Sequence, residues 1–247
     1  MFQNKEPTHS PSEPIQLSIG STTLKQQEKA KLLGVIIHQD LKQHQTVNNI
    51  IKKIQPTIYS FRFANKYLPT HIMRALYFTH IYPHLIGAIS IWGTDKHKAD
   101  YIQPLIRTQK KIVRLIVNKP PRTHTKPLMN QLKILSIPYL YIYRVSIETH
   151  PYIHPTKQLN RPAHDHNYLS IAHIHDYPTR YARQKHQYIP NRSCKKNRPP
   201  AHNIEHLNAK YARVWNAIPE HIRDTRSLKT FKALLKDYLL EKQNNAV

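Results

Sequence analysis

The chain has 247 residues, and its 38 lysines and arginines outnumber its 14 aspartates and glutamates to give a formal net charge of +24. An excess of this size favours a polyanionic partner, most commonly nucleic acid, with an anionic membrane surface as the alternative. The single cysteine excludes an internal disulfide, and the absence of a Gly-rich motif argues against a compact nucleotide-binding enzyme. Because the sequence has neither a signal peptide nor an apolar run of roughly 18 residues, we expect an intracellular protein of the nucleus or cytoplasm with no membrane partner.

The N-terminal part is predicted to combine a tail with a small β element. Residues 1–14 are polar and rich in proline, which predicts a disordered tail. Apolar and polar residues alternate over 15–19 and a Gly-Ser turn follows, so we expect a β-hairpin within residues 15–40. The apolar run over residues 32–37 is rich in β-branched side chains and suits a buried strand.

Residues 41–150 are predicted to form a helical domain whose first helix is long and amphipathic. Pro56 falls inside its pattern and predicts a kink or a division. Its apolar face has members at three- and four-residue steps, namely Val47, Ile50, Ile51, Ile54, Ile58 and Phe61.

A second and a third helix are predicted in the same domain. Pro69 and Thr70 start the second helix, Pro83 interrupts it, and Trp92 is expected to be buried between the two helices. Thr94 or Asp95 is predicted to cap the third helix. The apolar face of that helix comprises Ile102, Leu105, Ile106, Ile112, Val113 and Ile116.

The C-terminal part is predicted to begin with a loop. Residues 151–203 are rich in Pro, His and Arg and show no hydrophobic period, which predicts an irregular segment. Residues 204–247 are predicted to contain a terminal helix that Ser227 caps. Its apolar stripe comprises Leu228, Phe231, Leu235, Tyr238 and Leu239. The fold class is therefore mainly α with a small N-terminal β-hairpin.

Several blocks of the sequence follow the order found in one family. They are LLGVIIHQDL at 32–41, the LY, IYPHL and IWG elements within 76–93, RTHTKPL with LKIL within 122–135, WNAIP at 215–219, and SLKTFKALLKDYLL at 227–240. Together they resemble the palm edge and thumb of reverse transcriptases from jockey-like non-LTR retrotransposons. The resemblance implies a fragment of an RNA-directed DNA polymerase, with a helical thumb-like bundle that lies along a template–primer duplex.

The catalytic residues of that family are absent from this sequence. By resemblance, the intact enzyme holds Mg²⁺ on an Asp-Asp pair of the palm. The aspartates here are isolated, at Asp40, Asp95, Asp100, Asp165, Asp176, Asp224 and Asp237. We therefore expect no cofactor in this chain, no polymerase activity by this chain alone, and a palm and endonuclease portion as further partners.

The candidate site is the basic surface of the predicted helices. No acidic residue lies between Leu41 and Thr94 or between Tyr101 and Ile147. These windows predict a positive surface that tracks the phosphate backbone of RNA, an RNA–DNA hybrid or DNA without reading its sequence. The interleaved Tyr and Phe residues either stack on bases or, as most such residues do, pack in the core. The predicted nucleic-acid-binding residues are Lys52, Lys53, Arg62, Lys66, Arg107, Lys110, Lys111, Arg114 and Arg122.

Other functions remain as alternatives. His80 and His84 are four residues apart, but Pro83 separates them, and no cysteine or well-placed carboxylate completes a tetrahedral metal site. The histidines at 164–175 fall in the predicted loop. The alternatives to a polymerase fragment are a non-enzymatic basic RNA-binding protein and a non-functional transposon relic. An Asp-Asp motif encoded upstream of Met1 would favour the polymerase interpretation, whereas stop codons and frameshifts there would favour the relic.

Overall fold

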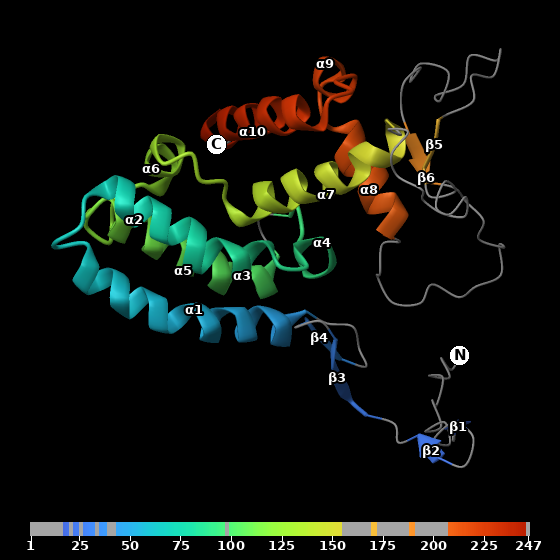
Figure 1. The fold of residues 1–247 in the computed structure, drawn as a ribbon, viewed down its shortest axis with the longest axis horizontal. Coiled ribbons are helices and arrows are strands. Elements are labelled where there is room, and N and C mark those ends of the chain that lie inside the picture. The colour runs from blue at the N-terminus through green and yellow to red at the C-terminus, as the bar shows by residue number, and fades with distance from the viewer. Residues whose placement is uncertain are drawn as a thin grey trace, which may run out of the picture. The chain divides into compact units, whose positions relative to one another are not determined.

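The described part of the chain is mostly helical, with small antiparallel strand pairs near the N-terminus, as the sequence predicts (Figure 1). It divides into two compact units, Met1–Thr46 and Val47–Val247. The predicted tail and most of the predicted loop at 151–203 lie outside the described residues. The computed structural model describes residues 17–19, 22–24, 27–32, 35–38, 43–96, 99–154, 169–171, 188–190 and 207–245.

The first unit contains two antiparallel pairs. Strand β1 (Leu17–Ile19) pairs with β2 (Thr22–Leu24), and β3 (Lys29–Leu32) pairs with β4 (Val35–His38). The first pair matches the predicted hairpin.

The prediction of one buried strand over residues 32–37 is wrong. Strand β3 ends at Leu32 and β4 begins at Val35, so two strands share the apolar run. Val35 is buried, but Ile37 is 40 % exposed and Leu32 is 59 % exposed, so the apolar run is not buried along its length.

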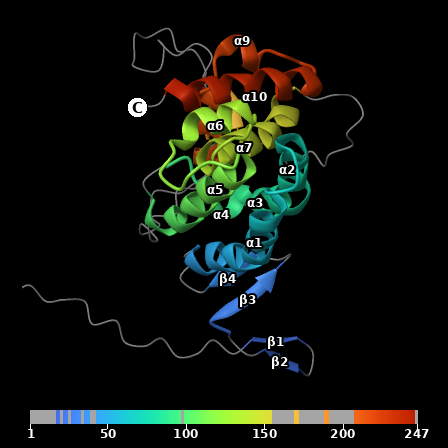
Figure 2. The same ribbon diagram turned by 90° about the vertical axis from the view of Figure 1, so that its left-hand side faces the viewer.

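The second unit is built of helices in layers (Figures 1 and 2). Helix α7 runs through the middle, with α10 on one side and α2, α3 and α5 on the other, and α1 lies beyond that second layer. A third strand pair joins β5 (Leu169–Ile171) to β6 (Tyr188–Pro190). The helical elements are α1 (His44–Ala64), α2 (Thr70–Leu76), the π-helix η1 (Tyr77–Ile81), α3 (Tyr82–Ile86), α4 (Ile89–Trp92), the 3-10 helix η2 (Asp100–Ile102), α5 (Gln103–Ile116), α6 (Thr125–Gln131), α7 (Ile137–Ile153), α8 (Leu207–Asn216), α9 (Glu220–Arg223) and α10 (Leu228–Asn245).

Helix α1 buries the face that its sequence predicts. Val47, Ile54 and Ile58 are fully or almost fully buried. The helix continues through Pro56, so the predicted division does not occur. The carbonyl of Lys52 has no amide partner four residues later, because Pro56 lacks an N–H group. Both residues are exposed, so water can bond to that carbonyl instead.

The second predicted helix begins after Pro69, as expected, and Pro83 interrupts it through a π-turn. In η1 the helix widens, and the amide of Tyr82 bonds to the carbonyl of Tyr77. The wider turn carries the chain past Pro83, which cannot donate a hydrogen bond and whose ring would strike the carbonyl four residues earlier. Helix α3 then starts with Pro83 in its first turn.

Trp92 is fully buried, as predicted, on the short helix α4 that packs against α7. Its indole Nε1 donates to the carbonyl oxygen of Gly87 at 2.7 Å. The residue that follows has no room for a side chain. A Cβ on Gly93 would lie 2.7 Å from Cδ2 of Tyr141 and would also strike the carbonyl oxygen of Ile89.

Helix α5 also buries its predicted apolar face, but the predicted cap is wrong. The helix follows η2 directly, and Ile102 stands at its N-cap without a side-chain bond. Thr94 instead accepts a bond from the amide of Lys96 at 3.1 Å, and Asp95 accepts one from Arg213 at 2.9 Å. The two polar residues thus bond elsewhere, which leaves the 3-10 turn to begin the helix.

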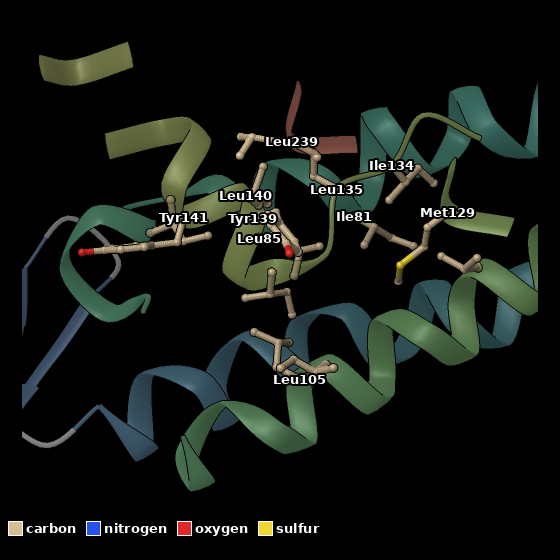
Figure 3. Close-up of a cluster of buried hydrophobic side chains, with 14 of the residues drawn as sticks. Ile81, Leu85, Leu105, Met129, Ile134, Leu135, Tyr139, Leu140, Tyr141 and Leu239 are labelled. Atoms are coloured by element: carbon tan, nitrogen blue, oxygen red, sulfur yellow. The ribbon is translucent and has the colours of Figure 1, made fainter. Parts of the chain in front are cut away.

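The core of the second unit is continuous across the predicted boundary between 41–150 and 204–247. Figure 3 shows Leu239 of α10 beside Leu135, which precedes α7, and Leu140, which lies in the first turn of α7. Ser227 accepts a long bond of 3.5 Å from the amide of Thr230 at the start of α10. The terminal stripe is buried at Phe231, Leu235 and Leu239, whereas Leu228 is 36 % exposed because it lies in the first turn.

Three side chains hold the segment at 132–137 that leads into α7. Arg74 donates from Nε to the carbonyl of Leu132 at 2.6 Å. Gln243 accepts from the amide of Ser136 at 2.7 Å and donates to the carbonyl of Ile134 at 3.3 Å. Gln109 approaches from α5, accepts from the amide of Ile137 at 3.2 Å and donates to the carbonyl of Leu135 at 2.9 Å. Segments far apart in the sequence therefore meet at this point.

Candidate nucleic-acid interface

The outer side of α1 carries the first group of predicted binding residues. Lys52, Lys53 and Arg62 are exposed on the helix, and Lys66 is exposed in the turn after it. We call these four residues the α1 basic face. No carboxylate occurs in the sequence between Leu41 and Thr94, so neighbouring residues of the chain do not neutralise this charge.

Exposed aromatic side chains lie among these cations. Tyr59 is 54 % exposed, Phe63 is 69 % exposed and Tyr67 is 84 % exposed. We call these three residues the aromatic stripe. Tyr59 and Phe63 are four residues apart, which places them on one side of α1, and Tyr67 lies in the turn that follows the helix. The carbon at the centre of the Arg62 guanidinium lies 5.4 Å from the centre of the Tyr59 ring, within range of a cation–π interaction.

An open hollow begins beside the aromatic stripe, and it is lined by Ile51, Lys52, Gln55, Pro56 and Tyr59. Sequence reasoning did not single out Tyr59, Phe63 or Tyr67, because most aromatic residues pack in a core. The helical period could have predicted their exposure, because positions 59 and 63 fall outside the buried series formed by Ile54, Ile58 and Phe61.

Helix α5 carries the second group of predicted residues. Arg107, Lys110 and Lys111 are exposed on it, and we call them the α5 basic face. Arg114 is half-buried, and its Nε donates to the carbonyl oxygen of Thr123 at 2.8 Å. It therefore anchors the turn after α5, and Arg122 is exposed within that turn.

Helices α1 and α5 lie side by side (Figures 1 and 3). At their C-terminal ends, the Asn65 side-chain amide donates to the carbonyl oxygen of Leu115 at 3.4 Å. This contact brings the turn with Lys66 and the turn with Arg122 to the same end of the helix pair. The last carbonyl groups of a helix carry partial negative charge, which stabilises cations placed there. The structure thus brings both groups of predicted residues onto adjacent helices.

Neither a metal cluster nor a membrane span occurs in the described ranges. Among these residues, no three His, Cys, Asp or Glu side chains gather closely enough to hold a metal ion. His80 and His84 are both exposed, and the histidines at 164–175 lie outside the described residues. No helix in the same ranges combines the length and the apolar character needed to cross a bilayer.

The ionisable groups with shifted pKa values lie outside the α1 and α5 basic faces. Burial raises the pKa of Tyr82 to about 12, and burial raises the pKa of Tyr77 still further, although its hydrogen bond to Gln109 opposes this shift. Burial also lowers the pKa of His150, whose Nε2 bonds to the carbonyl oxygen of Thr225 at 2.7 Å. These groups have packing roles.

Comparisons of the chain with protein-family models, with curated proteins and with solved structures found no match.

Proposed function

We propose that this chain binds RNA–DNA hybrid, RNA or DNA duplexes through phosphate contacts made by the α1 and α5 basic faces. The observation that supports the proposal most directly is the exposure of these cations on two adjacent helices whose sequences contain no acidic residue. The resemblance to retrotransposon reverse transcriptases implies the same role, that of a thumb-like part beside a polymerase palm. The proposed location is the nucleus or the cytoplasm.

Binding of this kind is electrostatic. Lysine and arginine side chains that contact phosphates release counterions from the nucleic acid, so affinity falls as salt rises. The α1 and α5 basic faces together supply seven exposed cations, namely Lys52, Lys53, Arg62, Lys66, Arg107, Lys110 and Lys111. Each phosphate contact contributes about 0.7–0.9 to the log–log slope, so full engagement of the seven cations would give a slope of about −5 to −6. Because phosphates carry no sequence information, all sequences should bind alike.

Polymerisation is proposed to depend on residues outside this chain. The resemblance places the Mg²⁺-binding aspartates in a palm, and the sequence here holds no Asp-Asp pair. The palm and endonuclease portions of such an element are therefore the proposed protein partners, and this chain would hold the duplex beside them.

Charge reversal tests the proposal. The double variants Lys52→Glu with Lys53→Glu, and Lys110→Glu with Lys111→Glu, are expected to weaken binding to hybrids of every sequence. Each lost contact should lower the salt slope by about 0.7–0.9. Fluorescence anisotropy with labelled hybrids over a range of salt concentrations measures both quantities.

A matched control is available on α10, where Lys229 and Lys232 are exposed and lie three residues apart. Reversing both changes the net charge by the same amount on a helix outside the proposed interface. If this variant weakens binding as much as the α1 and α5 variants do, net charge alone explains the affinity and the proposal fails. A loss confined to one hybrid sequence would indicate base readout and would also contradict it.

A further inference from the structure

We propose that the aromatic stripe on α1 and the turn after it is a stacking platform for single-stranded nucleic acid, so that the chain holds an unpaired strand next to the duplex that it binds. The proposal rests on the proposed function for the neighbouring phosphate contacts, and it adds a second class of ligand. Its basis is the joint exposure of Tyr59, Phe63 and Tyr67 among the cations of the α1 basic face.

The exposure of these rings sets the stripe apart from the rest of α1. Phe63 and Tyr67 leave most of their surface in water, at 69 % and 84 %, while Phe61 in the same helix is 2 % exposed. Proteins that bind single strands combine a basic groove with aromatic rings on which bases stack. Every base has a flat π-face, so such binding tolerates any sequence.

The spacing of the rings favours an unpaired strand over a duplex. Tyr59 and Phe63 are separated by four residues of α-helix, which advance by roughly 6 Å, whereas bases in a stacked strand follow one another at about 3.4 Å. Successive bases of a duplex therefore cannot meet these two rings. The bases of a single strand can be splayed apart, and their faces are free to stack on side chains.

The charges beside the stripe favour a polyanion over a second copy of this chain. Lys52 and Arg62 are exposed on α1, and Lys66 is exposed in the turn after it. Arg62 packs on the ring of Tyr59. Two copies that met through this stripe would bring these cations together, and like charges in an interface oppose association. A phosphate backbone would instead run beside the rings and pair with the cations.

The test compares a single-stranded RNA that carries 2-aminopurine with a blunt RNA–DNA hybrid, using the full chain. Phe63→Ser and Tyr67→Ser are each expected to weaken single-strand binding by about five- to 150-fold. Hybrid binding should stay unchanged, and the salt slope should stay unchanged because no cation is removed. The fall in 2-aminopurine fluorescence that stacking produces should be lost as well. Tyr67→Phe, which keeps the ring, should retain both the affinity and the quenching.

Ile72→Ser is the control for the loss of an exposed apolar side chain, because Ile72 is 39 % exposed but lies on α2 outside the stripe. If the wild-type chain binds hybrids but the serine variants bind single strands normally, the platform is refuted and the proposed function stands. If the charge reversals leave hybrid binding unchanged while the serine variants lose stacking, the proposed function is refuted and the stacking platform is supported. Serine variants that change only self-association in sedimentation experiments would identify the stripe as a contact between copies, which overturns the proposal.

Discussion

Replacing Gln109 by leucine should strongly destabilise the fold, because this side chain bonds to three buried partners. Its Nε2 donates to the carbonyl of Leu135 at 2.9 Å and contacts the hydroxyl of Tyr77 at 3.1 Å. Its Oε1 accepts from the amide of Ile137 at 3.2 Å. Gln109 is 1 % exposed, so water cannot replace these bonds without opening the core.

The expected cost follows from the groups left behind. Leucine has nearly the volume of glutamine, so the cavity term is small. The substitution strands three polar groups, and a buried group without a partner costs about 1–3 kcal/mol. The Tyr77 hydroxyl can rotate towards another acceptor. The carbonyl of Leu135 costs less free energy without a partner than the amide of Ile137 does. We therefore expect Gln109→Leu to lower the free energy of unfolding by about 3–5 kcal/mol.

Urea denaturation of the full chain measures this change through tryptophan fluorescence, since Trp92 and Trp215 are both fully buried in the core. Gln131→Leu is the matched control, because Gln131 is exposed at the end of α6, and it should shift stability by no more than about 0.5 kcal/mol. A loss below about 1 kcal/mol for Gln109→Leu would refute the view that these bonds secure the start of α7.

Four further outcomes are expected. Trp92→Ala should cost about 3–5 kcal/mol in urea denaturation, and iodide should fail to quench Trp92 in the folded chain; free quenching would contradict its burial. Gly93→Ala should lower the free energy of unfolding by about 1–3 kcal/mol, because the new Cβ would lie 2.7 Å from Tyr141. Gly87→Ala should cost less, because its Cβ would lie 3.2 Å from the Pro83 carbonyl oxygen, and equal losses would contradict the close approach at Gly93. Burial lowers the pKa of His150 in the folded state, so the unfolded chain takes up the proton at a higher pH. The free energy of unfolding should therefore fall as pH drops from about 6.5 towards the lowered pKa. His150→Gln should flatten this dependence in denaturation curves, and an unchanged dependence would contradict the role of His150. Purified chain with Mg²⁺ should not extend a primer on an RNA template, and template-dependent incorporation above background would disprove this.

The amphipathic period predicted the helix faces well. Helices α1 and α5 bury the apolar residues assigned from the sequence, except that Ile51 is only partly buried, and they expose Lys52, Lys53, Lys110 and Lys111. This success has a simple cause, since a side chain's position on a regular helix depends only on its place in the repeat. The candidate basic faces were therefore predictable before their surroundings were known.

Features that depend on tertiary contacts were not predictable in the same way. The sequence indicates an interruption at Pro83, but not that a π-turn would carry the helix past it. Asp95 is a suitable cap by its type and position, but in the structure it accepts a bond from Arg213, which lies far along the chain. Arg114 belongs to a basic face by period, yet Thr123 holds its side chain. In each case a local rule competes with a partner that the local sequence does not contain.

The bonds from Gln243 have a consequence for the order in which the chain can fold during synthesis. Gln243 bonds to Ser136 and Ile134, just before α7, and α10 packs against α7. A ribosome would release residues 47–153 well before these partners exist. Until α10 emerges, α7 would expose an apolar side that the finished protein buries. The second unit should therefore gain its stability only after α10 has left the ribosome, and a chain that lacked α10 would resemble that exposed intermediate.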